Sequence, residues 1–257
     1  MKIALVGYGR MGRAVDEVAG AAGHDVVARL GPQDPIHVET LRDAEVALEF
    51  TNPHSAVANV QRVSAAGADL VVGTTGWLEG LEDVTAIVRE AGIGMVYAPN
   101  FALGVHLFFQ IARAVGKLLV AYSDYDVYVR EEHHRHKADH PSGTGRHLAE
   151  QLVELLPGKH GWAPGPSDGL PDPETLWVTS VRSGEIPGNH VIGLEGPDDR
   201  LEIRHEARGR EGFARGALQA AEWVRGRVGV FTLDDMIRDR LGSPGEGRGS
   251  AGVPDGS

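Results

Sequence analysis

Short apolar runs alternate with amphipathic stretches along the first 120 residues. The runs that predict strands are Lys2–Val6, Asp25–Arg29, Val46–Phe50, Leu70–Val72 and Met95–Tyr97. Apolar side chains recur at helical spacing after Gly12 to about Ala22, and again around Ser55–Ala65, Leu81–Ala91 and Leu103–Val120. An apolar run without alternation is typical of a strand buried on both faces. Repeated strand–helix units therefore predict a parallel, doubly wound sheet.

The pattern changes after Val120. Asp124–Val129 alternates with period two, and three further segments predict strands: Leu176–Arg182, His190–Glu195 and Leu201–His205. The sequence Gly196-Pro197-Asp198-Asp199 predicts a tight turn between the last two. Strands joined by short turns indicate a second, α+β domain with a mixed or antiparallel sheet.

Three C-terminal features complete the pattern. Phe213–Arg225 has helical spacing, and Thr232-Leu233-Asp234-Asp235 predicts the start of another helix with acidic residues in its first turn. Between the predicted strands, Gly158–Pro173 is rich in Gly and Pro and predicts a loop, either a lid or a plain surface excursion. Residues 242–257 are too polar and glycine-rich to form a core and predict a disordered tail.

The first predicted strand runs directly into Gly7-Tyr8-Gly9-Arg10-Met11-Gly12, a G-x-G-x-x-G followed by a helical pattern. In that context the glycines permit a tight turn and close approach of a pyrophosphate. Small and hydroxyl residues also follow three later strands, at Phe50–Pro53, Gly73–Gly76 and Ala98–Phe101. Ordinary turn chemistry is the alternative. Three such stretches at strand ends favour a dinucleotide site.

The end of the second predicted strand lacks the acid that commonly binds the adenosine ribose of NAD. The chain there is Val27-Ala28-Arg29-Leu30-Gly31-Pro32. A guanidinium can pair with the 2′-phosphate of NADP. We therefore predict that Arg29 lets NADPH be accepted or preferred, with a solvated strand-end arginine as the alternative.

Composition narrows the classes of protein. The 257 residues, 42% hydrophobic and 24% charged, suit a globular protein, and a net charge of −11 argues against nucleic-acid binding. The absence of cysteine excludes disulfides and thiolate chemistry. The most apolar helical stretch, Leu103–Val120, is interrupted by four polar residues and predicts no membrane span. With no leader pattern at the N-terminus, we expect a cytoplasmic location.

The most unusual stretch is Glu131–Gly145, EEHHRHKADHPSGTG, which holds His133, His134, His136 and His140 together with Lys137. The run that begins at Pro141 opens a helical pattern, and a helix start presents free N–H groups and positive dipole to an anion. Imidazoles, an ammonium and a helix start together predict a pocket that binds and protonates a small carboxylate. Two alternatives are a surface loop and a metal site of His134 and His136 with His133 or His140.

This stretch closely resembles the motif E-x-H-H-x-x-K-x-D-x-P-S-G-T of the 4-hydroxy-tetrahydrodipicolinate reductase family, also called dihydrodipicolinate reductases. The resemblance extends from Gly7 to about Ile237 and includes the three strand-end stretches above. It also includes Arg182-x-Gly184-x-x-x-Gly188-x-His190 and the segment from Arg200 to Ala217. It implies a reductase of lysine and diaminopimelate biosynthesis that uses NADH or NADPH to reduce a dehydrated cyclic dicarboxylate to tetrahydrodipicolinate.

The resemblance also implies roles and an architecture. His133 corresponds to the family's proton donor/acceptor, Lys137 to its proton donor, and His134 with the backbone of Gly143 and Thr144 to its substrate-carboxylate ligands; no metal is implied. The implied fold is an N-terminal Rossmann-type domain, 1–103 completed by 213–241, and a substrate-binding and oligomerisation domain with an open mixed sheet, 104–212. Family members are usually homotetramers. With Arg29, the predicted cofactor contacts are Gly7, Tyr8, Gly9, Arg10, Met11, Gly12, Gly73, Thr74, Thr75, Ala98, Pro99, Asn100 and Phe101.

Two positions depart from the family pattern, and two other functions remain open. Family members often have a small residue in place of His140 and Ala in place of Gly145. The nearest rival is another nicotinamide oxidoreductase of similar architecture, such as an amino-acid dehydrogenase. A non-catalytic, ligand-sensing relative is the rival from a different class.

Overall fold

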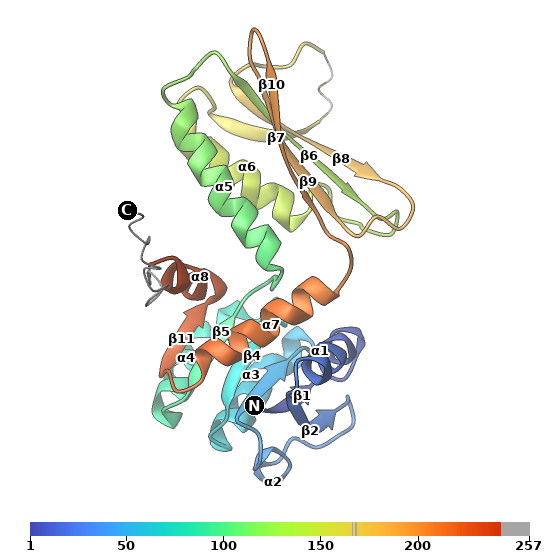
Figure 1. Ribbon diagram of the computed structural model, residues 1–257, viewed down its shortest axis with the longest axis vertical. Coiled ribbons are helices and arrows are strands. Elements are labelled where there is room, and N and C mark those ends of the chain that lie inside the picture. The colour runs from blue at the N-terminus through green and yellow to red at the C-terminus, as the bar shows by residue number, and fades with distance from the viewer. Residues whose placement is uncertain (166, 168, 243–257) are drawn as a thin grey trace, which may run out of the picture. The chain divides into compact units, whose positions relative to one another are not determined.

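The computed structural model describes residues 1–165, 167 and 169–242, and the chain divides into two compact units (Figure 1). Unit 1 is Met1–Phe101 together with the chain from Phe213, and unit 2 is Ala102–Gly212. The strands of unit 1 are β1 (Lys2–Val6), β2 (Asp25–Leu30), β3 (Val46–Glu49), β4 (Asp69–Val72), β5 (Gly94–Tyr97) and β11 (Gly229–Thr232). Its helices are α1 (Arg10–Ala21), α2 (Val38–Leu41), α3 (Pro53–Ala65), a 3-10 turn (Leu78–Gly80), α4 (Leu81–Ala91), α7 (Glu211–Val224) and α8 (Leu233–Gly242).

The six strands of unit 1 form one sheet in the order β11-β5-β4-β3-β1-β2, with every neighbouring pair parallel. The predicted doubly wound parallel sheet is confirmed. The order reverses between β1 and β3, which lie side by side although β2 separates them in the chain. Ligands of such sheets bind beyond the carboxyl ends of the strands at this reversal.

Continuous apolar runs form the centre of the sheet. The last four residues of β1 and all four of β3 are buried, as expected where helices cover both faces. The helices α3 and α4 lie side by side and share a buried cluster with the strands that includes Val60, Val84 and Leu70. The strand β11, which we did not predict, is four half-buried residues paired with β5 at the sheet edge.

Unit 2 contains a five-stranded mixed sheet in the order β10-β9-β6-β8-β7. Its strands are β6 (Asp126–His133), β7 (Gly161–Gly165), β8 (Thr175–Arg182), β9 (Asn189–Glu195) and β10 (Arg200–Glu206), and its helices are α5 (Leu103–Leu119) and α6 (Gly143–Leu155). The two helices lie side by side (Figure 1). Alternate residues of β6, such as Val127 and Val129, are buried in one cluster with Phe108 of α5 and Leu148 of α6. The predicted second domain with a mixed sheet is confirmed.

The predicted loop at Gly158–Pro173 contains a strand, and the predicted C-terminal tail falls almost wholly outside the described residues. The prediction of a loop throughout Gly158–Pro173 is wrong, because β7 lies within it and pairs in parallel with β8. The strand is at the sheet edge, where Pro164 is tolerated since its missing N–H interrupts no central ladder. The predicted tail lies outside the described residues except for Gly242, which ends α8. Among the described helices, none has the length and apolar character needed to cross a membrane.

Candidate active site

The turn after β1 depends on glycine for steric reasons. Gly7 has φ +98°, and a Cβ on it would lie 2.2 Å from the carbonyl oxygen of Phe50. A Cβ on Gly12 would lie 2.4 Å from the carbonyl oxygen of Gly7, whereas Gly9 has open space around it. The chain thus turns tightly between β1, β3 and α1 and leaves its backbone accessible at Gly9. This is the geometry that lets a pyrophosphate approach the start of a helix.

A cavity of about 620 Å³ opens at these strand ends. Of the predicted cofactor residues, Gly7, Tyr8 and Gly9 line it. Its other lining residues are Val6, Leu30, Gly31, Pro32, Asp34, Pro35, Ile36, His37, Phe50, Thr51, Asn52, Ser55, Asn59 and Arg62. Most of the second group was not assigned from sequence, because the segment after β2 and one face of α3 carry no recognisable motif.

Polar contacts join the loops at the cavity floor. The buried Glu49 accepts hydrogen bonds from the Thr51 hydroxyl and from Nδ2 of Asn59, the latter at 3.1 Å. The Thr51 N–H donates to Oγ1 of Thr74 at 2.8 Å. The stretches after β3 and β4, predicted separately, therefore form one network.

The remaining predicted cofactor residues lie outside the lining of this cavity. A Cβ on Gly73 would lie 2.0 Å from the ring of Phe50, whose centroid is 6.2 Å from that of Phe101. These contacts bring the ends of β3, β4 and β5 together. The predicted residues that do not line the cavity are Arg10, Met11, Gly12, Arg29, Gly73, Thr74, Thr75, Ala98, Pro99, Asn100 and Phe101. Their roles stay predictions.

The guanidinium of Arg29 is paired within the protein. Its Nε and Nη2 lie 2.7 Å from Oδ2 and Oδ1 of Asp16, and the Tyr8 hydroxyl donates to the same carboxylate at 2.5 Å. The hydrogen bonds from Arg29 hold the pKa of Asp16 below its usual range. The acid that lines the cavity is Asp34, whose Oδ2 accepts the Gly31 N–H at 2.7 Å.

In unit 2 the predicted helix start is confirmed at α6. Ser142 is its N-cap, and its Oγ accepts the Gly145 N–H at 3.1 Å. Gly143 and Thr144 are the first two helical residues, so their N–H groups have no acceptor within the helix. The two predicted carboxylate ligands at the helix start, Gly143 and Thr144, are therefore placed where an anion is stabilised.

The four histidines of the motif have different surroundings. His133 ends β6 and is 7% exposed, whereas His136 and His140 are exposed and His134 is half-buried. Burial lowers the pKa of His133 to about 4, against the opposing charge of Glu131. A Cβ on Gly188 would lie 3.1 Å from Nε2 of His133, so a small residue there leaves room for the ring. His133 is thus a buried, neutral imidazole at neutral pH.

The ammonium of Lys137 lies 2.8 Å from Oδ1 of Asp139. Burial would raise the pKa of Asp139, but hydrogen bonds from Lys137 and from the backbone, together with the charges of Lys137 and Arg146, hold that pKa below its usual range. Since the Lys137 side chain is 24% exposed, its ammonium remains accessible to an incoming ligand.

Glu131, His133 and His190 form the cluster of described residues whose spacing would suit a metal ion, with ligand atoms within 4.8 Å of one another. The guanidinium of Arg182 lies 2.7 Å from Oε1 of Glu131 and opposes a further cation there. The structure does not group His134 and His136 in a comparable cluster, as the three-histidine alternative required. Sequence reasoning gave Glu131 and His190 no role, because only strand register brings them together.

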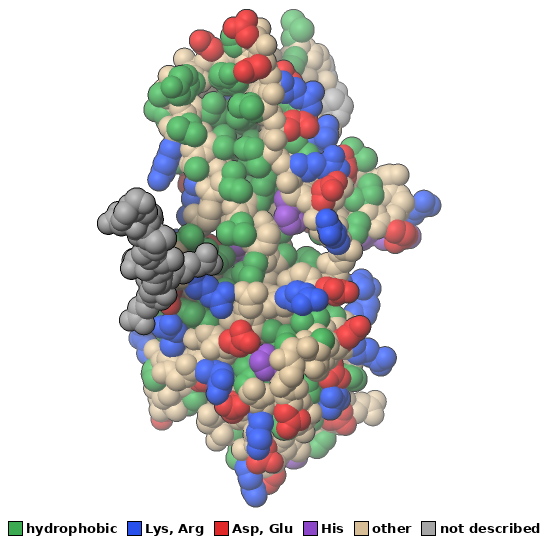
Figure 2. All heavy atoms as spheres, viewed as in Figure 1, with side chains coloured by type: hydrophobic (Ala, Val, Ile, Leu, Met, Phe, Trp, Pro, Cys, Tyr) green, Lys and Arg blue, Asp and Glu red, His purple; other side chains and the backbone are tan. Residues whose placement is uncertain are grey.

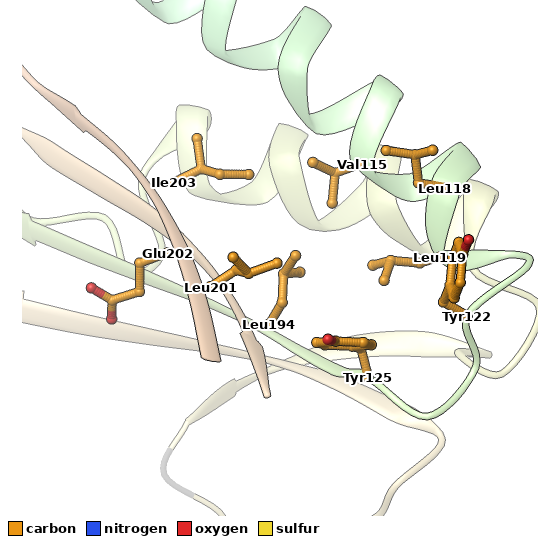
Figure 3. A pocket seen from close by; sticks show the side chains of 9 residues that line it. All are labelled: Val115, Leu118, Leu119, Tyr122, Tyr125, Leu194, Leu201, Glu202 and Ile203. Carbon is orange, nitrogen blue, oxygen red and sulfur yellow. The ribbon is translucent and has the colours of Figure 1, made fainter. Parts of the chain in front are cut away.

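Besides the cavity in unit 1, an apolar hollow of about 390 Å³ lies in unit 2 (Figure 3). Its lining residues are Val115, Leu118, Leu119, Tyr122, Tyr125, Leu194, Leu201, Glu202 and Ile203. Hydrophobic side chains also gather on this face of the unit in Figure 2. Its sole charged lining residue is the acid Glu202, so the hollow offers no cationic group for binding a carboxylate.

The fold and the two polar sites define a class. A glycine-turn crevice in a parallel sheet, with a second unit that carries a buried imidazole, an ammonium and a helix N-terminus, is the arrangement of a two-domain NAD(P)H-dependent oxidoreductase.

Comparison with known proteins identifies the family within that class. Residues 1–101 match the model of the dihydrodipicolinate reductase N-terminus, and residues 104–237 match that of its C-terminus. A 4-hydroxy-tetrahydrodipicolinate reductase from Christiangramia forsetii is 35% identical over 93% of this chain and 98% of its own length. One from Methanopyrus kandleri is 36% identical over 80% and 75%. The chain belongs to the dihydrodipicolinate reductase family.

One solved structure agrees with this assignment, and another shares the fold alone. A dipicolinate-bound dihydrodipicolinate reductase from Paenisporosarcina sp. TG-14 is similar with a TM-score of 0.73 and 25% identity, over 90% of this chain and 97% of that one. An amine dehydrogenase from Mycobacterium smegmatis shares the fold, with a TM-score of 0.55 and 12% identity over 91% and 95%.

Proposed function

We propose that this chain uses a nicotinamide cofactor to reduce dehydrated 4-hydroxy-tetrahydrodipicolinate to tetrahydrodipicolinate, a step of lysine and diaminopimelate biosynthesis. The observation that carries the proposal is the placement of a buried imidazole, an ammonium and a helix start within Glu131–Gly145, in a chain of this family. The relatives' names and the dipicolinate of the Paenisporosarcina structure support a cyclic dicarboxylate as substrate.

Unit 1 supplies the cofactor site. The turn at Gly7 and the open backbone at Gly9 fit a pyrophosphate, and the cavity beyond them fits the adenosine half. When bound, the cofactor supplies the hydride. The strand-end residues Gly73–Thr75 and Ala98–Phe101 contact the rest of the cofactor in this proposal.

Unit 2 binds the dicarboxylate and handles the proton. The N–H groups of Gly143 and Thr144 and the side chain of His134 bind substrate carboxylates. His133 is the proton donor and acceptor, and Lys137 is a proton donor. A bound dianion raises the pKa of the buried His133 from its low value, because opposite charge favours the imidazolium. Substrate binding thereby prepares the acid that protonates the reduced product.

The test is an assay of the purified chain with the condensation product of the preceding synthase and either cofactor. His133→Gln and Lys137→Met should each lower kcat by about 100-fold or more, the usual contribution of a positioned acid–base group. The matched control is His136→Gln, an exposed histidine of the same stretch, which should keep wild-type turnover. Normal kcat in both active-site variants would contradict the assignment.

Cofactor choice is a separate proposal. We retain Arg29 as the candidate for binding the 2′-phosphate of NADPH, which requires it to leave Asp16. Arg29→Ala should then raise the KM for NADPH and leave that for NADH unchanged. Equal KM changes for both cofactors would remove this role.

We also propose that the protein is a cytoplasmic homotetramer that associates through the sheets of unit 2, with no nucleic-acid or membrane partner. Family resemblance supports the assembly, and the net charge of −11 opposes binding to phosphate backbones. Light scattering should give four times the chain mass of 27.4 kDa. A monomer mass at micromolar concentration would contradict the assembly.

A further inference from the structure

We propose that Glu131 is a positioning residue whose buried carboxylate fixes both the anion-binding start of α6 and the environment of His133. The inference deepens the proposed function and rests on it for the roles of His133, Gly143 and Thr144. Glu131 itself touches neither substrate nor cofactor in this proposal, because it is fully buried.

The carboxylate of Glu131 accepts hydrogen bonds from three residues, one at the start of α6 and two in β8. Ser142 donates to it through its backbone N–H, 3.0 Å from each oxygen, and through its hydroxyl. Oγ of Ser180 in β8 donates at 2.9 Å, and Nη2 of Arg182 donates at 2.7 Å. These bonds outweigh the effect of burial, which would raise the pKa of Glu131, and hold that pKa below its usual range. The carboxylate therefore stays charged.

The first turn of α6 packs directly on this carboxylate. The Ser142 hydroxyl donates to Glu131 and accepts the Gly145 N–H, so its proton is directed toward the carboxylate. A Cβ on Gly145 would lie 2.7 Å from Oε2 of Glu131, which shows how closely the first turn of α6 packs on the carboxylate. The orientation of the Gly143 and Thr144 N–H groups is thus coupled to Glu131.

Two imidazoles lie beside the same carboxylate. Nδ1 of His133 is 3.9 Å from Oε1, and Nε2 of His190 is 3.7 Å from Oε2. These distances are too long for hydrogen bonds but short enough for a strong effect of charge. The charge of Glu131 raises the pKa of His133 against burial, which lowers it. The charged and titratable groups around His133 are Glu131, Lys137, Asp139, Arg182 and His190.

A purely structural ion pair with Arg182 is the competing explanation, and it predicts a loss of stability alone. A positioning role predicts two further effects of Glu131→Gln. Dicarboxylate binding weakens as the α6 start loosens, and the proton of His133 is lost at lower pH as the negative charge disappears.

The matched control is Glu132→Gln. Glu132 is the next residue of β6, so its side chain points to the opposite face of the sheet. It also interacts with basic groups, at 3.6 Å from Arg130 and 3.8 Å from Arg204, and accepts a hydrogen bond from Asn189 at 3.0 Å. Loss of a strand carboxylate is therefore common to both variants, and only Glu131→Gln removes it from beside His133.

The experiment measures dipicolinate affinity by calorimetry and the titration midpoint of His133 by NMR, with dipicolinate bound. Glu131→Gln should weaken dipicolinate about 10-fold and lower the midpoint by about one pH unit, as expected for loss of a charge at this distance. Glu132→Gln should change neither quantity. Unchanged affinity and midpoint in Glu131→Gln would overturn the inference. If Glu131→Gln shows both effects but the wild-type protein has no turnover, only the proposed function is overturned.

Ser142→Ala is the second variant, for the case in which Glu131→Gln does not fold. It removes the hydroxyl that joins Glu131 to the first turn of α6 and leaves the carboxylate charged. It should weaken dipicolinate several-fold and leave the His133 midpoint within a few tenths of a pH unit, because the charge remains. Wild-type affinity for dipicolinate in Ser142→Ala would overturn the inference.

Discussion

Single residues of one type acquire different chemistry in this protein through burial. His133 and His190 are almost fully buried on neighbouring strands, whereas His136 lies at the surface beside Glu185. Burial lowers the pKa of His133 to about 4 and that of His190 to about 3. Composition alone would treat the three histidines alike.

These lowered pKa values predict that stability falls in mild acid. Below pH 6.5 the unfolded chain protonates both histidines, while the folded state keeps them neutral until about pH 4 and 3. The free energy of unfolding should therefore decrease as pH falls from 7.5 to 5, by about 2 kcal/mol for each imidazole that stays neutral. In urea titrations over the same pH range, the free energy of unfolding of His190→Gln should fall by about 2 kcal/mol less than that of the wild-type protein. His136→Gln should keep the wild-type loss, and an equal loss in all three proteins would contradict the prediction.

At the scale of elements, strand ends and helix starts coincide where the sites are. Asn52 follows β3 and caps α3, with its Oδ1 accepting the N–H groups of His54 and Ser55 at 3.1 and 3.2 Å. Pro53 occupies the first helical position, where no N–H is needed. A single turn thus ends a strand, starts a helix and lines the cavity.

Removal of this cap should destabilise unit 1. Asn52→Ala leaves two N–H groups without their acceptor and should lower the free energy of unfolding by about 1 kcal/mol. Asn52→Asp retains an acceptor at the same place and should stay within about 0.5 kcal/mol of wild type. Urea unfolding without cofactor measures both. A loss in the aspartate variant equal to that in the alanine variant would show that the cap is not the cause.

The two strands that pattern alone missed share one property. The strands β7 and β11 are each at a sheet edge, are four or five residues long and are mostly half-buried. Without a continuous buried face they carry no strong hydrophobic period. The helix α5 was predicted to within one residue, as Leu103–Val120. The strand predicted at Asp124–Val129 was two residues early at its start and four residues short at its end, because β6 continues to His133.

For the whole molecule, the two units should respond to different ligands. NADH alone should slow amide exchange at Gly9–Gly12, within the segment where the cofactor is proposed to bind, and dipicolinate alone should slow it at Gly143 and Thr144. The reason is that a bound ligand occupies N–H groups that are otherwise open to water. Hydrogen-exchange mass spectrometry of the full chain checks both. Protection of the Gly9–Gly12 segment by dipicolinate alone would contradict the assignment of ligands to units.

The sequence by itself determined the parallel sheet, the glycine turn after β1, the helix start at Ser142 and the motif that places the chain in its family. These features are local, since hydrophobic period, glycine spacing and capping residues act within a few residues. Only the tertiary structure decided which side chains meet. Strand register places Glu131 opposite Ser180 and His190, and His133 opposite Arg182. A shift of one residue would reverse every side chain of β6, so the buried network around Glu131 exists only once the sheet has formed.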